Sequence, residues 1–523
     1  MRPLLWRPPV EPTPAERAVM RRIRRAKLFV FLRTHRHELF TERFQEELST
    51  IYGDSPLGQP PIPPARLALA TILQAYTGVS DDEAIEATVM DRRWQLVLDC
   101  LDTDEAPFSK GTLVNFRRLL IEHELDRRLV ERTVEVATKS GAFGPRALRA
   151  ALDSSPLWGA GRVEDTYNLL GHALRKALGV IARQQGRGLA EVATEAGASV
   201  VAGTKSLKAA LDLDWDDPHQ RQQALVEVLG ALDSVESWLE EGSGGEAALI
   251  SDIETARRVR AQDVEESADG TPVLRQGVAR DRVLSVEDPE MRHGRKSRRH
   301  RFDGYKRHVL KDLDSGLVRA VGITMANVAE ASATDAICAD LSRQRVRLKE
   351  LHIDRGYLSS KLVRDRPEGL EIYCKAWRVQ NRGYFPKTAF ELDWQRKVMR
   401  CPAGQEMGFE AGGVVRFPKK ICAACPLRER CTTSERGRSV SVHPDEKLLE
   451  ELRARQLTPE GRAKLRERIG VEHSLAHIGH WQGERARYIG ARKNLFDLRR
   501  SAVVHNLHVI ARNVDELQQA EPA

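Results

Sequence analysis

Three acidic residues that lie far apart in the chain place the strongest constraint on its fold. Asp153 follows an apolar run in Ala-Leu-Asp-Ser, and Asp354 follows another in Leu-His-Ile-Asp-Arg-Gly-Tyr. Glu472 lies in Arg-Ile-Gly-Val-Glu-His-Ser, four residues after Arg468, so the two side chains share one face of a helix. Carboxylates that converge only after folding are what a divalent-metal site for phosphoryl transfer needs, and this is the hypothesis to test.

The two aspartates are expected at the carboxyl ends of strands. Leu148 to Leu152 reads as a buried strand before Asp153, and Gly356 permits a sharp turn after Asp354. Ligands of α/β proteins bind at that edge of a sheet. Mg²⁺ prefers hard oxygen ligands, so two or three carboxylates suffice for a site. Taken alone, either aspartate is more often a helix cap or a turn residue.

A second acid, Glu467, competes with Glu472 for the third position of this set. The spacing of Glu472 to Arg468 favours Glu472. Glu467 is then interpreted as a solvated charge on a helix.

Basic residues are concentrated in parts of the chain. The whole chain has 83 Lys and Arg against 75 Asp and Glu, with a pI near 9.1. Residues 292–311 contain nine Lys or Arg and one acid, Asp303, and residues 1–50 contain eleven basic and six acidic residues. Such clusters indicate contact with a polyanion, although each alone is equally consistent with a solvated surface.

The cysteine content and the absence of long apolar runs predict a cytoplasmic location. Seven cysteines in 523 residues, without a signal peptide, are typical of a reducing compartment. No apolar run approaches the roughly 18 residues of a membrane span. No membrane partner is therefore expected.

Short helices are predicted for the N-terminal region. Apolar spacing indicates a helix from Arg66 to Tyr76, Ser80 is a plausible cap for Asp81 to Met90, and Ser109 can cap a helix that exposes Arg117 and Arg118. A series of short helices whose last member is basic is compatible with a helix-turn-helix domain that binds DNA. A plain helical bundle fits the same pattern equally well.

An α/β arrangement is predicted for the rest of the chain. A strand over 146–158 that ends at Asp153 is followed by an almost wholly helical insertion over 164–266. A hairpin over 302–324 with a turn at Asp314-Ser-Gly, a helix over 332–348, and strands over 351–354 and 371–375 come next. This order gives a mixed sheet with helices packed on it.

The combined motifs resemble those of bacterial insertion-sequence transposases of the DDE class. The resemblance covers most of the chain and rests on these stretches: Asp165-Thr-Tyr-Asn-Leu-Leu, Leu211-Asp-Leu-Asp-Trp-Asp-Asp-Pro, Asp288-Pro-Glu-Met-Arg-His-Gly-Arg-Lys-Ser, Phe302-Asp-Gly-Tyr-Lys-Arg-His-Val, Thr324-Met-Ala-Asn-Val, Asp354-Arg-Gly-Tyr and the Arg468-to-Glu472 spacing. The resemblance implies a ribonuclease-H-like α/β core in which Asp153, Asp354 and Glu472 hold Mg²⁺ or Mn²⁺.

The resemblance also implies an activity and partners. The expected activity is metal-dependent strand cleavage at element ends followed by strand transfer into target DNA. Expected partners are the terminal inverted repeats, target DNA and further copies of the chain in the DNA complex, with the protein on the bacterial nucleoid when DNA-bound. The alternatives are a metal-dependent DNA nuclease without strand transfer and a catalytically inert DNA-binding protein derived from a transposase.

The chain departs from related families at two positions near Glu472. Leu465 stands where they place a tyrosine, and Gly479 stands where they place a lysine. Nearby histidines or Lys493 are candidates to replace the missing contacts with transposon ends. The residues predicted to contact DNA are Lys306, Arg307, Arg468, His473, Arg485, Arg487 and Lys493.

Six regions are predicted from these patterns. They are an N-terminal helical, DNA-binding region (1–145), the first core strand with Asp153 (146–163), a helical insertion (164–268), a ribonuclease-H-like core segment with Asp354 (269–375), a cysteine-rich insertion (376–455) and C-terminal core helices with Glu472 (456–523).

Four cysteines of the cysteine-rich insertion form a candidate metal site. Cys401 precedes the pair Cys422-Ala-Ala-Cys425, and five residues separate Cys425 from Cys431. Four thiolates that include a CxxC pair suit tetrahedral Zn²⁺ in a closed structural site. Reduced thiols without metal are the alternative, because the spacing is irregular for a zinc ribbon. Flanking basic residues suit DNA contact as well as thiolate stabilisation.

Overall fold

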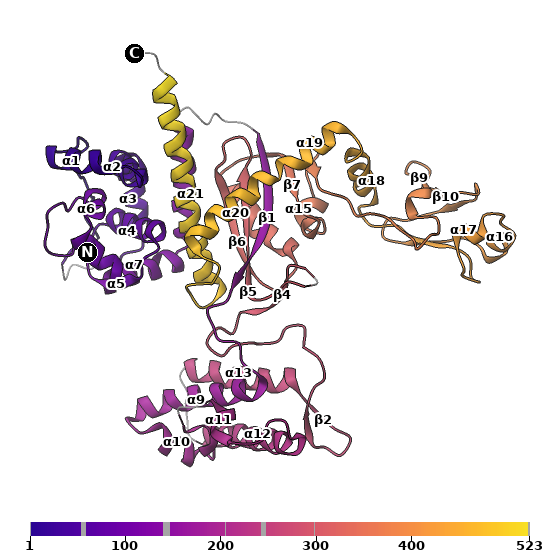
Figure 1. The fold of residues 1–523 in the computed structure, drawn as a ribbon, viewed down its shortest axis with the longest axis horizontal. Coiled ribbons are helices and arrows are strands. Elements are labelled where there is room, and N and C mark those ends of the chain that lie inside the picture. The colour runs from indigo at the N-terminus through magenta and orange to yellow at the C-terminus, as the bar shows by residue number, and fades with distance from the viewer. Residues whose placement is uncertain are drawn as a thin grey trace.

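The computed structural model describes residues 2–53, 59–139, 147–203, 206–241, 247–297 and 299–520, with only the backbone described at 241, 247–250 and 514–520. The predicted boundary at 145/146 lies outside the described residues. Figure 1 shows a central sheet flanked by N-terminal helices, by a separate group of helices and by a projecting arm. No helix in the described part of the chain is long and apolar enough to cross a membrane.

The N-terminal region is a bundle built around one buried helix, α4 (Pro64–Thr77). Ser80 and Ser109 accept the backbone N–H groups expected of N-caps, as predicted. The surrounding helices are α1 (Pro14–Arg22), α2 (Lys27–Leu39), α3 (Glu42–Ser49), α5 (Asp81–Met90), α6 (Arg92–Leu98), α7 (Lys110–Glu122) and α8 (Asp126–Lys139).

The prediction that Arg117 is exposed on its helix is wrong. Arg117 is 6% exposed, and its guanidinium donates to Asp81 at 2.5 Å and to Gln74 at 2.9 Å. The face of α7 that carries Arg117 packs against α4 and α5, so the charge meets a carboxylate instead of solvent. Arg118 on the next position remains exposed.

A six-stranded mixed sheet forms the centre of the molecule. Strand β1 (Leu148–Trp158) pairs antiparallel with β5 (Arg301–Asp312) and parallel with β7 (Leu348–Ile353), which pairs parallel with β8 (Glu371–Tyr373). The other edge of β5 pairs with β4 (Arg292–Arg295) and β6 (Val318–Met325). The predicted hairpin over 302–324 is therefore confirmed.

The predicted strand before Asp153 is longer than expected. Asp153 pairs with Val309, and the strand continues until Trp158 pairs with Gly304. On the other side, pairing with β7 stops at Leu152, one residue before Asp153. The prediction that the strand ends at Asp153 is wrong, because β1 stays paired with β5 after its pairing with β7 has ended. Asp153 nevertheless lies at the point where the pairing with the parallel strand β7 ends.

The two faces of the sheet bury different helices. Ala150 and Leu152 of β1 join a core with α14 (Thr334–Arg343), which is shorter than the predicted helix over 332–348. Ala151, on the opposite face, joins a core with α20 (Ile469–Gln482) and α21 (Ala491–Ala520). This alternation follows from the period of two in a strand. Figure 1 shows α21 between the N-terminal helices and the sheet.

A helical insertion with its own core separates β1 from β4. Its first helix, α9 (Thr166–Gln185), ends at Gly186, which takes the left-handed conformation. The further elements are α10 (Leu189–Glu195), η1 (Ser199–Val201), α11 (Leu207–Leu211), α12 (Pro218–Glu241), α13 (Ala247–Asp263), β2 (Val264–Glu266) and β3 (Pro272–Leu274).

The cysteine-rich segment forms the arm that projects from the core in Figure 1. Small sheets pack around Phe390, Met399 and Phe417. Its elements are η4 (Lys387–Ala389), β9 (Glu391–Asp393), β10 (Val398–Arg400), β11 (Glu406–Gly408), β12 (Val414–Arg416), α16 (Lys419–Ala423), α17 (Arg428–Cys431) and β13 (Ser439–Ser441), and α18 (Glu446–Arg455) and α19 (Pro459–Glu467) lead back to α20.

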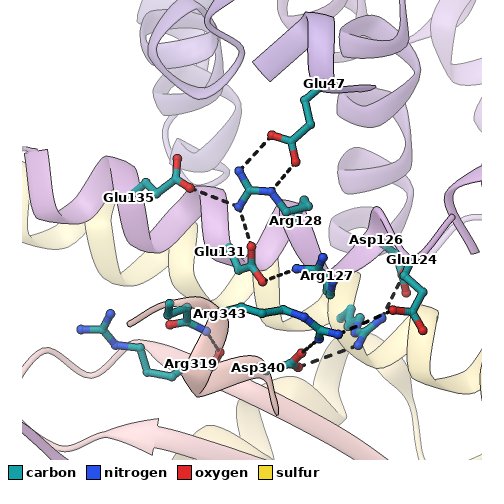
Figure 2. A network of polar contacts seen from close by, with 12 residues as sticks. Glu47, Glu124, Asp126, Arg127, Arg128, Glu131, Glu135, Arg319, Asp340 and Arg343 are labelled. Atoms are coloured by element: carbon teal, nitrogen blue, oxygen red, sulfur yellow. Dashed lines mark hydrogen bonds and ion pairs between the residues drawn. The ribbon is translucent and has the colours of Figure 1, made fainter. Parts of the chain in front are cut away.

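A polar network joins the N-terminal bundle to the core, as Figure 2 shows. Arg128 of α8 donates to Glu47 at 2.5 Å and to Glu131 at 2.5 Å. Asp126, which is 1% exposed, accepts from Arg492 and Arg499 of α21. A buried carboxylate held by two guanidinium groups is costly to separate from them, so these contacts stabilise the packing of the bundle against α21.

Candidate active site

A cleft of about 780 Å³ opens beside the ends of β1 and β7, and it contains all three predicted acids. Asp153 comes from β1, Asp354 follows β7, and Glu472 lies in the first turn of α20. The cleft is lined by Asp153, Ser154, Ser155, Pro156, Arg295, Lys296, Phe302, Lys306, Arg307, Glu330, Asp354, Arg468, Glu472, Leu475, Ala476, Gly479, His480 and Glu484.

Local structure directs each acid toward the cleft. Asp354 caps the short 3₁₀-helix η3 (Arg355–Tyr357), and its carboxylate accepts from the backbone N–H of Arg355 at 2.7 Å. Glu472 lies one helical turn after Arg468, and the ion pair between them is 2.8 Å long. The shared helix face predicted for these two residues is therefore confirmed.

Arg468 connects two of the three acids. Its guanidinium donates to Asp153 through one nitrogen and to Glu472 through another. The ligand atoms of Asp153, Asp354 and Glu472 do not all lie within 4.8 Å of one another. Among the described His, Cys, Asp and Glu residues, the group that meets this criterion is Glu350, His352 and Glu467. Arg468 thus holds Asp153 and Glu472 together across the space between them.

Asp153 is the most enclosed of the three acids. Its side chain is 14% exposed, whereas that of Glu472 is 50% exposed. Burial raises the pKa of Asp153, Arg468 and the backbone N–H of Ser154 oppose this shift, and the carboxylates of Asp354 and Glu472 add to it. A cation bound among the three would favour their charged forms, so the residues present fit a divalent ion.

Glu467 lies outside the cleft. Its carboxylate pairs with Arg149 near the start of β1 and with Lys464 at 3.6 Å. Nearby Glu350 accepts from the same Lys464 at 2.8 Å. The acids of this group therefore already have cationic partners. Of the two glutamates, Glu472 is the one that lines the cleft.

A further carboxylate in the cleft, Glu330, was not anticipated from the sequence. It begins η2 (Glu330–Ala333), just after β6, and accepts from the Ser154 hydroxyl at 2.5 Å. The sequence offers only a weak signal for it, namely its place a few residues beyond the Thr324-Met-Ala-Asn-Val stretch.

Basic side chains form one wall of the cleft. Lys306 lines it, and burial lowers the pKa of its ammonium group, which donates to the Val328 carbonyl at 2.8 Å. Arg295, Lys296 and His480 line it as well. Lys306, Arg295 and Lys296 place positive charge in the same cleft as the acids, which suits binding of a phosphate backbone.

Arg307, predicted to contact DNA, is 5% exposed and has internal partners. It donates to the Ser155 hydroxyl at 2.7 Å and to the Gly483 carbonyl at 2.9 Å, and burial lowers its pKa to about 10. A Cβ at Gly479 would lie 3.2 Å from its guanidinium, so Arg307 occupies the space beside Gly479. Arg307 therefore lines the cleft with its guanidinium bound to other groups of the protein.

Of the predicted DNA contacts, Lys306, Arg307 and Arg468 line the cleft, and the other four lie outside its lining. His473, Arg485, Arg487 and Lys493 are exposed. Arg487 donates to the Gly78 carbonyl at 3.0 Å and so reaches the N-terminal bundle. The segment around Arg485 also pairs with the end of β1, through a bridge to Trp158.

The four cysteines of the arm face one cavity of about 250 Å³. Burial raises the pKa of Cys431, and the thiols of Cys422, Cys401 and Cys425 add to the shift. Within the described residues, no three of these sulfurs lie within 4.8 Å of one another. Zn–S bonds of about 2.3 Å would require the thiols to draw closer together.

Three family profiles match separate parts of the chain. A family described as "Transposase domain (DUF772)" matches residues 20–119, which include most of the N-terminal bundle. Families described as "Transposase DDE domain" match residues 267–383 and residues 400–511. The first of these segments contains Asp354 and the second contains Glu472. No curated protein and no solved structure matches the chain.

The matched domains define the class of protein as a DDE-type transposase, an enzyme that acts on DNA. The chain belongs to the transposases with a DDE domain, of the insertion-sequence type. Enzymes of this kind bind DNA and generally use divalent metal ions. Asp153 falls outside all three matched segments, so its assignment depends on the geometry of the cleft.

Proposed function

We propose that this chain cleaves DNA strands at the ends of its element and transfers the freed 3′ ends into target DNA. The observation that carries the proposal is the convergence of Asp153, Asp354 and Glu472, from three separate elements, in one cleft with Arg468. We also propose a ribonuclease-H-like core. The order of the strands, with β1 between antiparallel β5 and parallel β7, supports that assignment.

Asp153, Asp354 and Glu472 would hold the metal, which we propose to be Mg²⁺ or Mn²⁺. When bound, such an ion activates a water or a 3′-hydroxyl and stabilises the leaving oxygen. Arg468 would keep Asp153 and Glu472 oriented toward the cleft. Lys306 and His480, which line the cleft, would contact the phosphate backbone of the bound DNA.

The proposed DNA partners are the terminal inverted repeats and the target. Exposed Arg485, Arg487 and Lys493 supply charge close to the N-terminal bundle, and Arg118 supplies charge on the bundle itself. Further copies of the chain would join the complex, because two element ends must be held together. Binding through phosphate contacts should weaken steeply as salt rises.

Two other functions would use the same cleft. A metal-dependent nuclease would cleave element ends without joining them to a target, and an inert DNA-binding protein would do neither. The presence of all three acids in the cleft supports an active enzyme. Incubating the protein with labelled element ends, a plasmid target and Mg²⁺ separates the three possibilities.

The expected result of that experiment is cleavage at the element ends together with labelled ends joined to the plasmid. Cleavage without joined product would favour the nuclease. Binding without cleavage would favour the inert protein. The protein carrying Asp354→Asn serves as the control, and it should bind the ends without producing either product.

We propose separately that Cys401, Cys422, Cys425 and Cys431 bind one structural Zn²⁺. Their arrangement around a shared cavity supports this. Lys419 and Lys420 of α16 and Arg428 and Arg430 of α17 flank the cavity, and they would give the arm a basic surface for DNA.

A further inference from the structure

Glu330 contacts the residue beside one catalytic aspartate. Its Oε1 accepts a hydrogen bond of 2.5 Å from the Ser154 hydroxyl, and Ser154 directly follows Asp153 on β1. The two residues are 176 positions apart, so this contact forms only in the folded protein. It joins the start of η2 to the strand that carries Asp153.

The same carboxylate packs against the backbone beside the second aspartate. Gly356 comes two residues after Asp354, and a Cβ built at Gly356 would lie 1.9 Å from Oε2 of Glu330. The absence of a side chain at Gly356 therefore lets the carboxylate approach the turn closely. Glu330 thus touches the chain next to Asp153 with one oxygen and next to Asp354 with the other.

The surroundings of Glu330 restrict its movement. Lys306, whose ammonium group interacts favourably with Glu330, is itself held by the Val328 carbonyl at 2.8 Å. Tyr357 is fully buried next to the turn, and its hydroxyl contacts His308 at 2.7 Å. Burial raises the pKa of Tyr357, so its hydroxyl stays protonated. The carboxylate of Glu330 therefore lies near a lysine and a buried tyrosine that each have a hydrogen-bond partner of their own.

We infer that Glu330 is a positioning residue that sets the separation between Asp153 and Asp354, and through it the affinity of the site for its metal. This rests on the proposed function of the cleft. Glu330 positions the two aspartates through the Ser154 hydroxyl and the Gly356 backbone. This role therefore requires a side chain of the same shape with an oxygen that accepts a hydrogen bond. Loss of such an outer partner typically costs 10- to 100-fold in metal affinity or activity.

The test measures end cleavage as a function of Mg²⁺ concentration for Glu330→Ala, Glu330→Gln and Ser154→Ala in the full chain. Glu330→Ala should raise the Mg²⁺ concentration for half-maximal cleavage at least about tenfold. Glu330→Gln keeps an oxygen that accepts from Ser154 and should stay within about threefold of the parent. Ser154→Ala should shift in the same direction as Glu330→Ala, and the double variant should be no worse than Glu330→Ala alone.

Two controls separate positioning from general damage. Asp335→Asn removes an exposed carboxylate at the start of α14 and should leave the Mg²⁺ dependence unchanged. Binding of element ends without metal should be the same for all variants. If the Glu330→Ala protein does not fold, the inference is tested by the change in the Mg²⁺ concentration for half-maximal cleavage in Ser154→Ala.

Three results would overturn the inference. One is a parental Mg²⁺ dependence in both Glu330→Ala and Ser154→Ala. The second is a loss in Glu330→Gln as deep as that in Glu330→Ala, which would make Glu330 a direct metal ligand. The third is additive loss in the double variant. If the parent protein does not cleave element ends, the proposed function is wrong. If the parent cleaves and the Glu330 and Ser154 variants show the same Mg²⁺ dependence as the parent, only this inference is wrong.

Discussion

The guanidinium of Arg468 donates to the carboxylate of Asp153, which lies 315 positions earlier in the chain. The same group donates to Glu472 at 2.8 Å. One side chain therefore aligns two of the three acids, and its positive charge opposes the effect of burial on the pKa of Asp153. This contact links the first strand of the sheet to the C-terminal helices.

Replacing Arg468 with alanine should impair the site without emptying it. The three carboxylates remain, but Asp153 and Glu472 lose their shared partner, so strand cleavage should fall about 10- to 100-fold. Arg468→Lys should recover little, because an ammonium group cannot bridge two carboxylates in the same fixed geometry. Single-turnover cleavage of a labelled element end measures both variants. A loss as deep as that of Asp354→Asn would mean that Arg468 does more than align the acids.

Asp153→Asn should raise thermal stability at neutral pH while abolishing activity. Because the pKa of Asp153 is raised by burial in the folded protein, its favourable contribution is present at low pH and is lost as pH rises through the folded-state pKa. Asparagine does not ionise, so the variant does not lose this stability as pH rises. Melting temperatures measured without divalent metal from pH 4 to pH 8 should diverge as pH rises and converge near the unfolded pKa of about 3.9. A variant that melts below the parent at pH 8 would contradict this.

Arg117 should matter for stability, whereas its neighbour Arg118 should not. Arg117 is buried, whereas its partner Asp81 is 27% exposed, so Arg117→Ala should lower the free energy of unfolding by about 1–3 kcal/mol. Arg118 is exposed, and Arg118→Ala should stay within about 0.5 kcal/mol of the parent. Urea denaturation followed by circular dichroism measures the difference. Equal effects at the two positions would contradict the burial of Arg117.

Purified protein should contain about one zinc per chain if the four arm cysteines share a metal. Cys425→Ser should lose the zinc and destabilise the arm. Cys374→Ser is the matched control, because that thiol is buried in the core of the sheet and lies outside the cavity. Metal analysis of protein purified without chelator measures the content. Absence of zinc from such protein would end the proposal.

Local features of the fold could be predicted because their causes lie close together in the sequence. Ser80 and Ser109 cap the helices that directly follow them. The turn at Gly316, which has a φ of 76°, separates two apolar strands that pair as a hairpin. The i, i+4 relation of Arg468 and Glu472 likewise needs only the period of one helix.

Long-range packing decided the features that could not be predicted. The helical pattern around Arg117 does not reveal that Asp81 of another helix faces it. The length of the strand beyond Asp153 depends on β5, which comes more than a hundred residues later. Glu330 lies in the cleft only because the path of the chain from β6 to η2 places it next to Ser154. Each of these three features depends on a contact between segments that are distant in the sequence. The residue pattern of a single segment does not indicate such a contact.

The central claim is that Asp153, Asp354 and Glu472 act as one metal-binding unit. Strand cleavage of a labelled element end with Mg²⁺ should fall at least about a thousandfold in Asp153→Asn, Asp354→Asn and Glu472→Gln. The losses should not add when the changes are combined, because the residues act together. Glu467→Gln, whose glutamate pairs with Arg149 outside the cleft, should remain largely active.

The most direct measurement is this cleavage assay run side by side on Glu472→Gln and Asp354→Asn, with Glu467→Gln as control. The account predicts that the first two are inactive and that the third is close to the parent. Near-normal cleavage by Glu472→Gln with loss in Glu467→Gln would move the third acid out of the cleft. Near-normal cleavage by Asp354→Asn would contradict the mechanism itself.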